Sequence, residues 1–205
     1  MNATSQILPV NIVRRIHQIQ AVTIAWMSVE VTLALVAAWR ARSPALVAFG
    51  GDSAVELLSA VVVLWRFRSP AAGENDEQRA ARIAGWLLVL LAAYVIVVSA
   101  LTLLGYNEAR PSYLGMAILA AAVVVMPWLA REKRRLSSAT KSAALRADAA
   151  ESALCAYLSL VALAGLAIRA IWHVAWADPV AALLATPLIA WEAREAMRGR
   201  PCDCC

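Results

Sequence analysis

The sequence predicts an all-α, polytopic membrane protein with six transmembrane helices and both termini in the cytoplasm. Of its 205 residues, 62% are hydrophobic and only 16% are charged, and the mean hydropathy is +0.66. The charges gather into short clusters that separate apolar runs of about 20 residues, the length that crosses a hydrocarbon core about 30 Å thick. A soluble core of this size would not need so much apolar surface, so the composition indicates the polytopic membrane class.

Six apolar runs are candidates for membrane spans. The sixth is the weakest, because Asp178 and Pro179 interrupt its start and the stretch 181–190 alone is too short to cross the bilayer. We retain it because the charge distribution requires an even number of spans. In chain order, the predicted spans are residues 21–39, 44–65, 83–104, 113–130, 147–168 and 174–191.

Arginine and lysine are distributed unevenly between the two sides of these spans. With a cytoplasmic N-terminus, most of the 19 Lys and Arg residues fall in the inside segments. Cytoplasmic loops carry the excess of positive charge, so both termini are predicted to be cytoplasmic. The basic stretch 131–135 is interpreted as a solvated loop, and the acidic stretch 74–77 as a polar loop. The outside segments keep only Arg40, Arg42, Arg110 and Arg169.

The net charge of +5 follows from this topology and from contact with anionic lipid headgroups. The basic residues are dispersed among loops without an aromatic stacking surface, so we expect no nucleic-acid binding. No short apolar segment precedes a small-residue cleavage site, and the first helix is expected to remain as an anchor in the inner cell membrane. No nucleophile paired with a base, nucleotide-binding loop or cofactor signature is evident, so we expect neither an enzyme nor a bound cofactor.

Asp52 and Glu56 lie one helical turn apart in the middle of the second predicted span. At about 1.5 Å per residue, they lie about 12 and 18 Å below Pro44 and bracket the bilayer midplane. An ionisable side chain at this depth costs at least roughly 3 kcal/mol, so such groups usually face a protein interior and carry ions or protons. The alternative is a hydrogen-bonded or protonated pair buried between helices. We predict a cation-binding site.

A second pair, Glu151 and Cys155, has the same spacing on the fifth predicted span. Residues four apart share one face of a helix, and the two pairs lie at overlapping depths on antiparallel helices. Together they offer three carboxylates and a thiolate to one ion. Tetrahedral sites with such ligands suit Zn²⁺, and the thiolate argues against Mg²⁺ and Ca²⁺. In the simpler interpretations, Glu151 snorkels or pairs with Arg146, and Cys155 is a small apolar residue.

Two segments resemble the transmembrane domain of cation diffusion facilitator (cation efflux) transporters. They are FGGDSAVELLS at 49–59 and LRADAAES at 145–152. The sequence WADP at 176–179 also resembles the start of the family's sixth helix. The resemblance implies six spans, cytoplasmic termini, exchange of a divalent metal for protons, and a homodimer formed through the membrane helices.

The resemblance also implies that the metal binds between the second and fifth helices. Asp52 and Glu56 occupy the second-helix ligand positions, and Glu151 and Cys155 occupy the fifth-helix positions. On the fifth helix the family usually has His and Asp, so this chain differs at both places. We expect residues 1–200 to form a cation-efflux-like transmembrane domain and residues 201–205 a Cys-rich cytoplasmic tail, without the family's usual C-terminal cytoplasmic domain.

Three further acidic residues have less specific signals. Glu30 lies in the middle of the first predicted span, where it is either a proton relay or outer support for the metal site, or a protonated side chain bonded to a neighbouring helix. Asp148 is interpreted as a cap or charge-pair residue near the start of the fifth helix, with a relay or ligand role as the second option. Asp178, before Pro179, is interpreted as a structural N-cap.

The four cysteines do not suggest a disulfide framework. One lies within a span, and the others lie in a tail that is predicted to be reduced. Three thiols within four residues offer a ligand cluster to soft metals, so the tail either collects metal at the cytoplasmic mouth or is dispensable. These residues are Cys202, Cys204 and Cys205.

These patterns predict an inner-membrane carrier of a divalent transition metal. Zn²⁺ is the default by resemblance, the cysteines favour Cd²⁺ or another soft metal as the alternative, and proton exchange provides the driving force. The expected partners are the lipid bilayer, the metal ion, protons and a second copy of the chain. Two other functions fit the sequence. One is a membrane metal sensor or partner subunit without transport, and the other is a proton-coupled exporter of organic cations that uses Glu30 or Asp52.

Overall fold

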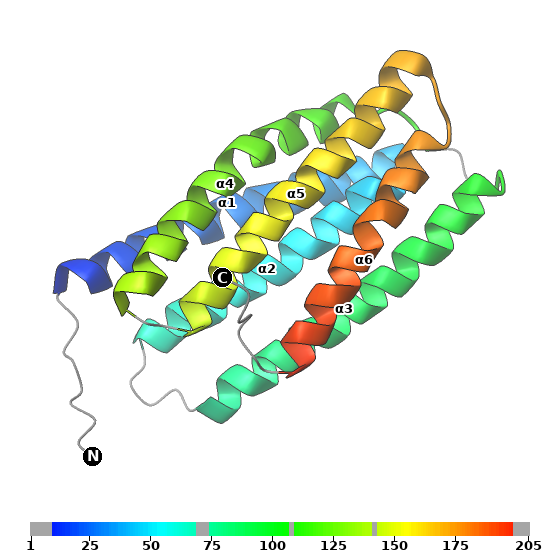
Figure 1. Cartoon of the computed structure of the whole chain (residues 1–205). Coiled ribbons are helices and arrows are strands. Elements are labelled where there is room, and N and C mark those ends of the chain that lie inside the picture. Colours follow the sequence, from blue (N-terminus) through cyan, green and yellow to red (C-terminus); the bar gives the residue numbers. More distant parts are fainter. Residues whose placement is uncertain (1–9, 69–73, 107–108, 141–142, 199–205) are drawn as a thin grey trace.

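The computed structural model describes residues 10–68, 74–106, 109–140 and 143–198 of the chain. Within these ranges the protein forms six helices and no strand (Figure 1). The predicted all-α fold is therefore confirmed. The helices are α1 (Val10–Ala41), α2 (Pro44–Arg68), α3 (Glu74–Leu103), α4 (Tyr113–Thr140), α5 (Ala143–Trp172) and α6 (Ala177–Arg198).

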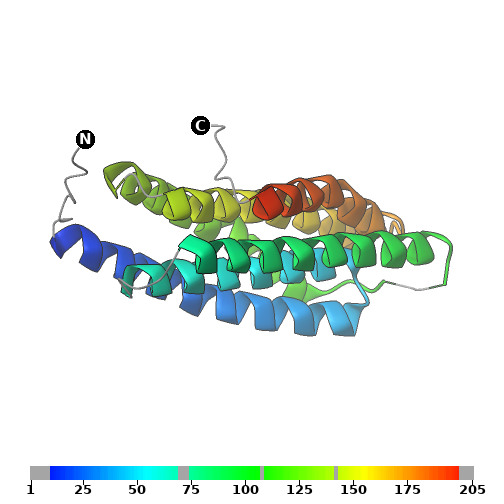
Figure 2. The same cartoon turned by 90° about the horizontal axis from the view of Figure 1, so that it is seen from below.

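Consecutive helices alternate in direction, so α1 begins and α6 ends at the same end of the bundle (Figure 1). Helix α2 is central and packs against α1, α3, α5 and α6. Helix α4 packs against α1 and α5 on one side, and α3 packs against α6 on the other. Seen from below, the axes of the six helices are roughly aligned with one another (Figure 2). This arrangement gives α2 and α5 a shared interior.

Five helices, α1 to α5, contain a segment that is long and apolar enough to cross a membrane. Helix α6 does not, because Asp178 lies in its first turn and Glu192, Arg194 and Glu195 lie near its end. Its 22 residues nevertheless give a length of about 33 Å, which matches the hydrocarbon core. Helix α6 packs between α3 and α5. The six-helix membrane architecture thus holds, and the predicted weakness of the sixth span has a compositional basis.

The loops predicted at 74–77 and 131–135 were wrong, because both stretches are helical. Helix α3 begins at Glu74, and α4 continues to Thr140. Arg, Glu, Lys and Leu are all strong helix formers. In α4 the buried side chains Met126, Leu129, Lys133 and Leu136 follow at spacings of three and four, so the basic stretch extends the inward-facing side of the helix.

The N-terminus of α2 is capped by Ser43 and tied to α6. The Ser43 hydroxyl accepts a hydrogen bond from Leu46 N at 3.1 Å, and Pro44 occupies the first helical position, where its missing N–H is not needed. The same hydroxyl donates to Asp178 Oδ1 at 2.6 Å. The prediction that Asp178 caps α6 was wrong, since α6 begins at Ala177. Asp178 instead joins the starts of α2 and α6.

Two glycines allow α6 to approach its neighbours closely. A Cβ atom on Gly85 of α3 would lie 2.9 Å from the backbone oxygen of Ala193. A Cβ atom on Gly165 of α5 would lie 2.4 Å from the Cβ of Ala181. Small residues at such contacts are typical of helices that pack within membranes. These contacts hold α6 close to the interior that α2 and α5 share.

Candidate functional site

Polar side chains line the inner faces of α1, α2 and α5. On each helix they are buried and follow one another at spacings of three, four or seven residues, which places them on one face. Apolar residues such as Met27, Phe49 and Leu158 occupy neighbouring buried positions. The bundle therefore encloses a polar interior rather than a purely apolar core. The residues are Gln20, Thr23 and Glu30 on α1, Ser53 and Glu56 on α2, and Asp148, Ser152, Cys155 and Ser159 on α5.

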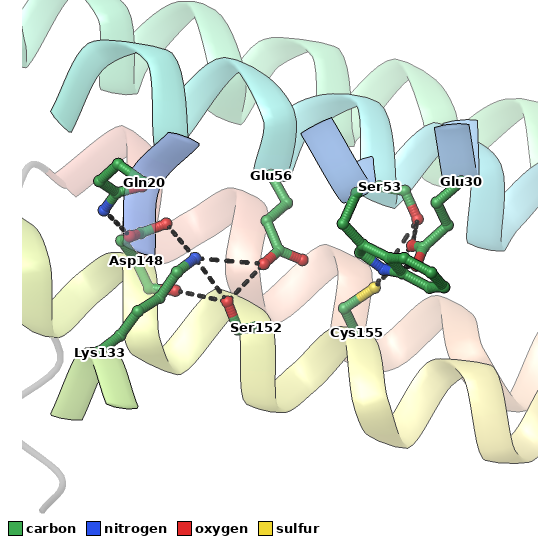
Figure 3. A network of polar contacts seen from close by, with 9 residues as sticks. Gln20, Glu30, Ser53, Glu56, Lys133, Asp148, Ser152 and Cys155 are labelled. Carbon is green, nitrogen blue, oxygen red and sulfur yellow. Dashed lines mark hydrogen bonds and ion pairs between the residues drawn. The ribbon is translucent and has the colours of Figure 1, made fainter. Parts of the chain in front are cut away.

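The first group, the cysteine cluster, comprises Trp26, Glu30, Ser53 and Cys155. Ser53 Oγ donates a hydrogen bond to Glu30 Oε1 at 2.7 Å, and Trp26 Nε1 donates to Glu30 Oε2 at 2.6 Å. The thiol of Cys155 points at Glu30 Oε1, with an S···O distance of 3.7 Å, and lies 3.7 Å from Ser53 Oγ. Three helices thus place a carboxylate and a thiol next to each other in the protein interior (Figure 3).

The second group, the lysine cluster, comprises Gln20, Glu56, Lys133, Asp148 and Ser152 (Figure 3). Lys133 Nζ lies 2.8 Å from Asp148 Oδ1 and 2.8 Å from Ser152 Oγ. Gln20 Nε2 donates to Asp148 Oδ2 at 2.6 Å, and Ser152 Oγ donates to Glu56 Oε1. The ammonium group also forms a longer ion pair with Glu56 Oε1 at 3.6 Å. This cluster joins α1, α2, α4 and α5.

Glu56 lies between the two clusters. Its Oε1 atom accepts from Ser152 in the lysine cluster, whereas Oε2 is buried without a hydrogen-bond partner. Figure 3 shows this second oxygen on the side that faces Cys155. An unpaired carboxylate oxygen in a dry interior is costly unless a cation or proton occupies it. The Glu56 carboxylate therefore bonds to the lysine cluster through one oxygen and presents the other oxygen to the cysteine cluster.

Asp52 and Glu151 face a different part of the interior. Asp52 is buried, with 4% of its surface exposed, and its carboxyl group lies within hydrogen-bonding reach of Glu192 on α6. Glu151 lies within hydrogen-bonding reach of Ser59 on α2, and its Oε2 atom is buried without a partner. These carboxyl groups form an acidic row between α2, α5 and α6.

The structure places the four predicted ligands on the two expected helices, α2 and α5. Glu56 faces Cys155 (Figure 3), whereas Asp52 meets Glu192 on α6. Within the described residues, no group of three or more His, Cys, Asp or Glu side chains is arranged to hold a metal ion. That these four side chains bind one metal ion stays a prediction.

Two other predicted residues have well-defined surroundings. Asp148 is buried and ion-paired with Lys133, which confirms the predicted charge-pair role, although the partner is on α4. Glu30 is fully buried and bonds to Ser53 on the neighbouring helix α2. The three predicted tail ligands, Cys202, Cys204 and Cys205, lie outside the described residues.

The sequence analysis missed two charged residues of the interior. Lys133 was assigned to a solvated loop, yet its side chain is 0% exposed. Its position four residues after Leu129 and three before Leu136 was the available signal, because both are buried on the same face of α4. Glu192 was not considered, since it follows the predicted end of the last span. Without the packing of α6 on α2, the sequence offers no signal that it meets Asp52.

Comparison with known protein families identifies one match. The model of the cation efflux transmembrane domain matches residues 21–198, a range that includes the cysteine cluster, the acidic row and every member of the lysine cluster except Gln20. No curated protein matches the chain.

Proposed function

Because the chain belongs to the cation efflux family, we propose that this multi-pass membrane protein exports a divalent transition metal, Zn²⁺ by default, in exchange for protons. Cd²⁺ or another soft metal is the alternative substrate. The protein acts as a carrier and not as an enzyme. Asp52, Glu56, Glu151 and Cys155 remain the proposed metal ligands. The geometry favours Cys155 as the first to bind, with Glu30 in contact with it and the unpartnered Oε2 atom of Glu56 facing it.

The contact between Cys155 and Glu30 supports this proposal most strongly. The Cys155 Sγ atom lies 3.7 Å from Glu30 Oε1. Two ligands of one tetrahedral zinc ion, one sulfur and one oxygen, are separated by roughly 3.5 Å when the bonds are 2.0 to 2.3 Å long. The two atoms therefore need little movement to share an ion. The unpartnered Glu56 Oε2 offers a third ligand from the opposite side.

Proton exchange follows from the chemistry of these ligands. A thiol binds Zn²⁺ as the thiolate, so metal entry at Cys155 releases a proton, and metal departure takes one up. Carboxylates buried with like charges nearby also bind protons when no metal is present. We propose that Asp52, Glu151 and Glu192 exchange protons or pass the ion as it moves along α2, α5 and α6.

The test is metal flux into proteoliposomes that carry a pH gradient. Zn²⁺, Cd²⁺ and Mn²⁺ are offered in turn to the wild-type protein, to Glu56→Gln and to Glu132→Gln. Glu132 is the matched control because it is also acidic and buried, but its partners are Arg15 on α1 and Arg135 on α4, which belong to neither cluster. We expect gradient-driven flux of Zn²⁺ or Cd²⁺ that Glu56→Gln reduces to the level of protein-free vesicles and Glu132→Gln preserves.

Other outcomes point to other functions. Tight metal binding without flux under any gradient would contradict export and support a metal sensor or partner subunit. Flux of an organic cation that survives removal of the Cys155 thiol would contradict a metal substrate. The proposed homodimer is tested by measuring the mass of the same protein reconstituted in nanodiscs. The proposed cytoplasmic C-terminus is tested by labelling the tail thiols from one side of the vesicle.

A further inference from the structure

Lys133 is a buried cation that the proposed transport cycle does not yet use. It lies on α4, and its side chain is 0% exposed. A lysine in a dry interior requires nearby negative charge and hydrogen-bond acceptors. Asp148 Oδ1 and Ser152 Oγ provide both at 2.8 Å, and Gln20 holds the other oxygen of Asp148 in place.

The position of the ammonium group matters because it also faces the proposed metal ligand Glu56. Lys133 Nζ lies 3.6 Å from Glu56 Oε1, and Figure 3 shows Lys133 between Asp148 and Glu56. Ser152 bridges the two charges, because it accepts from Lys133 and donates to Glu56. In a low-dielectric interior, charges at such distances interact strongly. A cation that binds Glu56 is therefore repelled by the positive charge of Lys133.

We propose that Lys133 is an internal competitor of the transported metal, a fixed positive charge that limits the affinity of Glu56 for the ion and promotes its release. This inference rests on the proposed function and deepens it. When the metal leaves, the ammonium group remains beside the carboxylate that the metal has vacated, so that carboxylate is not left without a positive charge nearby. When the metal binds, repulsion from the ammonium group keeps the site weak enough to empty again.

Asp148 and Gln20 set the position of this competitor. Both oxygens of Asp148 are occupied, one by Lys133 and the other by Gln20, so the ion pair is anchored to α1 and α5. These contacts hold Lys133 Nζ 3.6 Å from Glu56 Oε1, which is longer than a hydrogen bond. Lys133 thus acts on the metal through Glu56 and its charge, as a positioning residue rather than a ligand.

The experiment measures Zn²⁺ affinity by competition with a fluorescent chelator, using protein in nanodiscs. All variants carry Ser at positions 202, 204 and 205, so that the tail thiols do not contribute. The variants are Lys133→Met, Lys133→Arg, and the double variant Lys133→Met with Asp148→Asn. The double variant removes both charges of the ion pair. It keeps the test valid if Lys133→Met alone misfolds because Asp148 has lost its partner. Arg131→Met is the control, because Arg131 is exposed on the same helix.

We expect Lys133→Met to bind Zn²⁺ about tenfold more tightly than the parent, because a nearby positive charge has been removed. The double variant shifts in the same direction by less, and Lys133→Arg and Arg131→Met match the parent. In proteoliposomes, the concentration of Zn²⁺ that gives half-maximal flux falls in Lys133→Met, and the maximal rate falls with it. A merely structural role for Lys133 would weaken binding and would not tighten it.

The outcomes separate this inference from the function on which it rests. If the parent binds Zn²⁺ and moves it, but neither neutral variant binds more tightly, the internal competitor is overturned and the transport proposal stands. If Lys133→Arg tightens binding as much as Lys133→Met, the charge is not the cause and the inference is equally overturned. If the parent binds none of the three metals used in the flux assay, both proposals are overturned together.

Discussion

The lysine cluster and the cysteine cluster share one interior but balance their charges differently. In the lysine cluster, Lys133 is paired with Asp148 at 2.8 Å, and the charge-neutral contacts of Gln20 and Ser152 complete the hydrogen bonds of the pair. In the cysteine cluster, Glu30 is bonded only to neutral donors, and within the described residues no Lys or Arg forms an ion pair with it. Among the described residues, the lysine cluster includes a cation and the cysteine cluster does not.

This difference indicates that the cysteine cluster is suited to bind the metal ion and that the lysine cluster is suited to regulate the affinity for that ion. A carboxylate held only by neutral donors has no cation of the protein beside it, so a metal ion or a proton can neutralise it. A carboxylate that already has an ammonium partner gains less from a metal. Glu56 contacts the lysine cluster through Oε1 and faces Cys155 on its other side (Figure 3), so its affinity for an ion depends on how strongly Lys133 acts on it.

Removing the anchor of the lysine cluster should cost the most stability. Asp148→Asn leaves Lys133 buried with only the more distant Glu56 as a charged partner, and we expect a loss of about 3 kcal/mol in the free energy of unfolding. SDS-induced unfolding in mixed micelles measures it. Adding Lys133→Met to Asp148→Asn should recover most of the loss. Equal instability of the single and double variants would contradict the ion-pair explanation.

Removing the thiol should mainly affect metal binding. Cys155→Ala takes away a proposed ligand, and we expect Zn²⁺ affinity to fall at least about 100-fold, the upper end of what the loss of an outer-shell partner costs. Ser159→Ala, one turn further along the same face of α5, should leave affinity unchanged. Calorimetry of protein with Ser in place of the tail cysteines provides the measurement. Unchanged affinity in Cys155→Ala would assign metal binding to the carboxylates alone.

Removing the indole donor should have an intermediate effect. Trp26→Phe keeps the ring volume roughly but deletes the hydrogen bond to Glu30 Oε2, which orients the carboxylate. We expect Zn²⁺ affinity to fall about tenfold, as for other partners of metal ligands. Trp39→Phe is the control, since Trp39 is on the same helix and 87% exposed. If the two variants bind Zn²⁺ equally well, Glu30 has no part in the metal site.

An ion pair outside both clusters should matter least. Arg15 bonds to Glu132 at 2.8 Å, but the Arg15 side chain is 61% exposed. We expect Arg15→Gln to change the free energy of unfolding by less than about 1 kcal/mol and to leave Zn²⁺ flux intact. The same SDS unfolding assay applies. A loss as large as that of Asp148→Asn would mean that burial does not distinguish the two ion pairs.

The membrane fold was largely predictable from the sequence because the length and apolar character of the runs set the positions of the spans. The weak sixth span is a helix, as expected, and Asp178 and the charges near its end explain its weak signal. The extent of α4 was not predicted. A run of Arg and Lys indicates a membrane boundary only statistically, whereas the continued spacing of Leu129, Lys133 and Leu136 shows which side chain points inward.

The candidate site was predictable only in part. Depth along the second span brings Asp52 and Glu56 to the interior, and helical spacing places them near one face. Which neighbour each side chain meets depends on the rotation of α2 against α5 and α6, and no local pattern encodes it. For this reason Glu56 was correctly placed beside the fifth helix, while the contact of Asp52 with Glu192 was not foreseen. The charge pair of Lys133 with Asp148 required the packing of α4 on α5.

The most direct test of the central claim asks whether a metal ion binds the Cys155 thiolate. The chain has four cysteines, so Ser at positions 202, 204 and 205 leaves Cys155 as the only thiol. Titration of this protein with Cd²⁺ should produce the ultraviolet charge-transfer absorbance of a cadmium–thiolate bond, saturating at one ion per chain, and Cys155→Ser in the same background should abolish it. Cd²⁺ binding without that absorbance would contradict a metal site at Cys155.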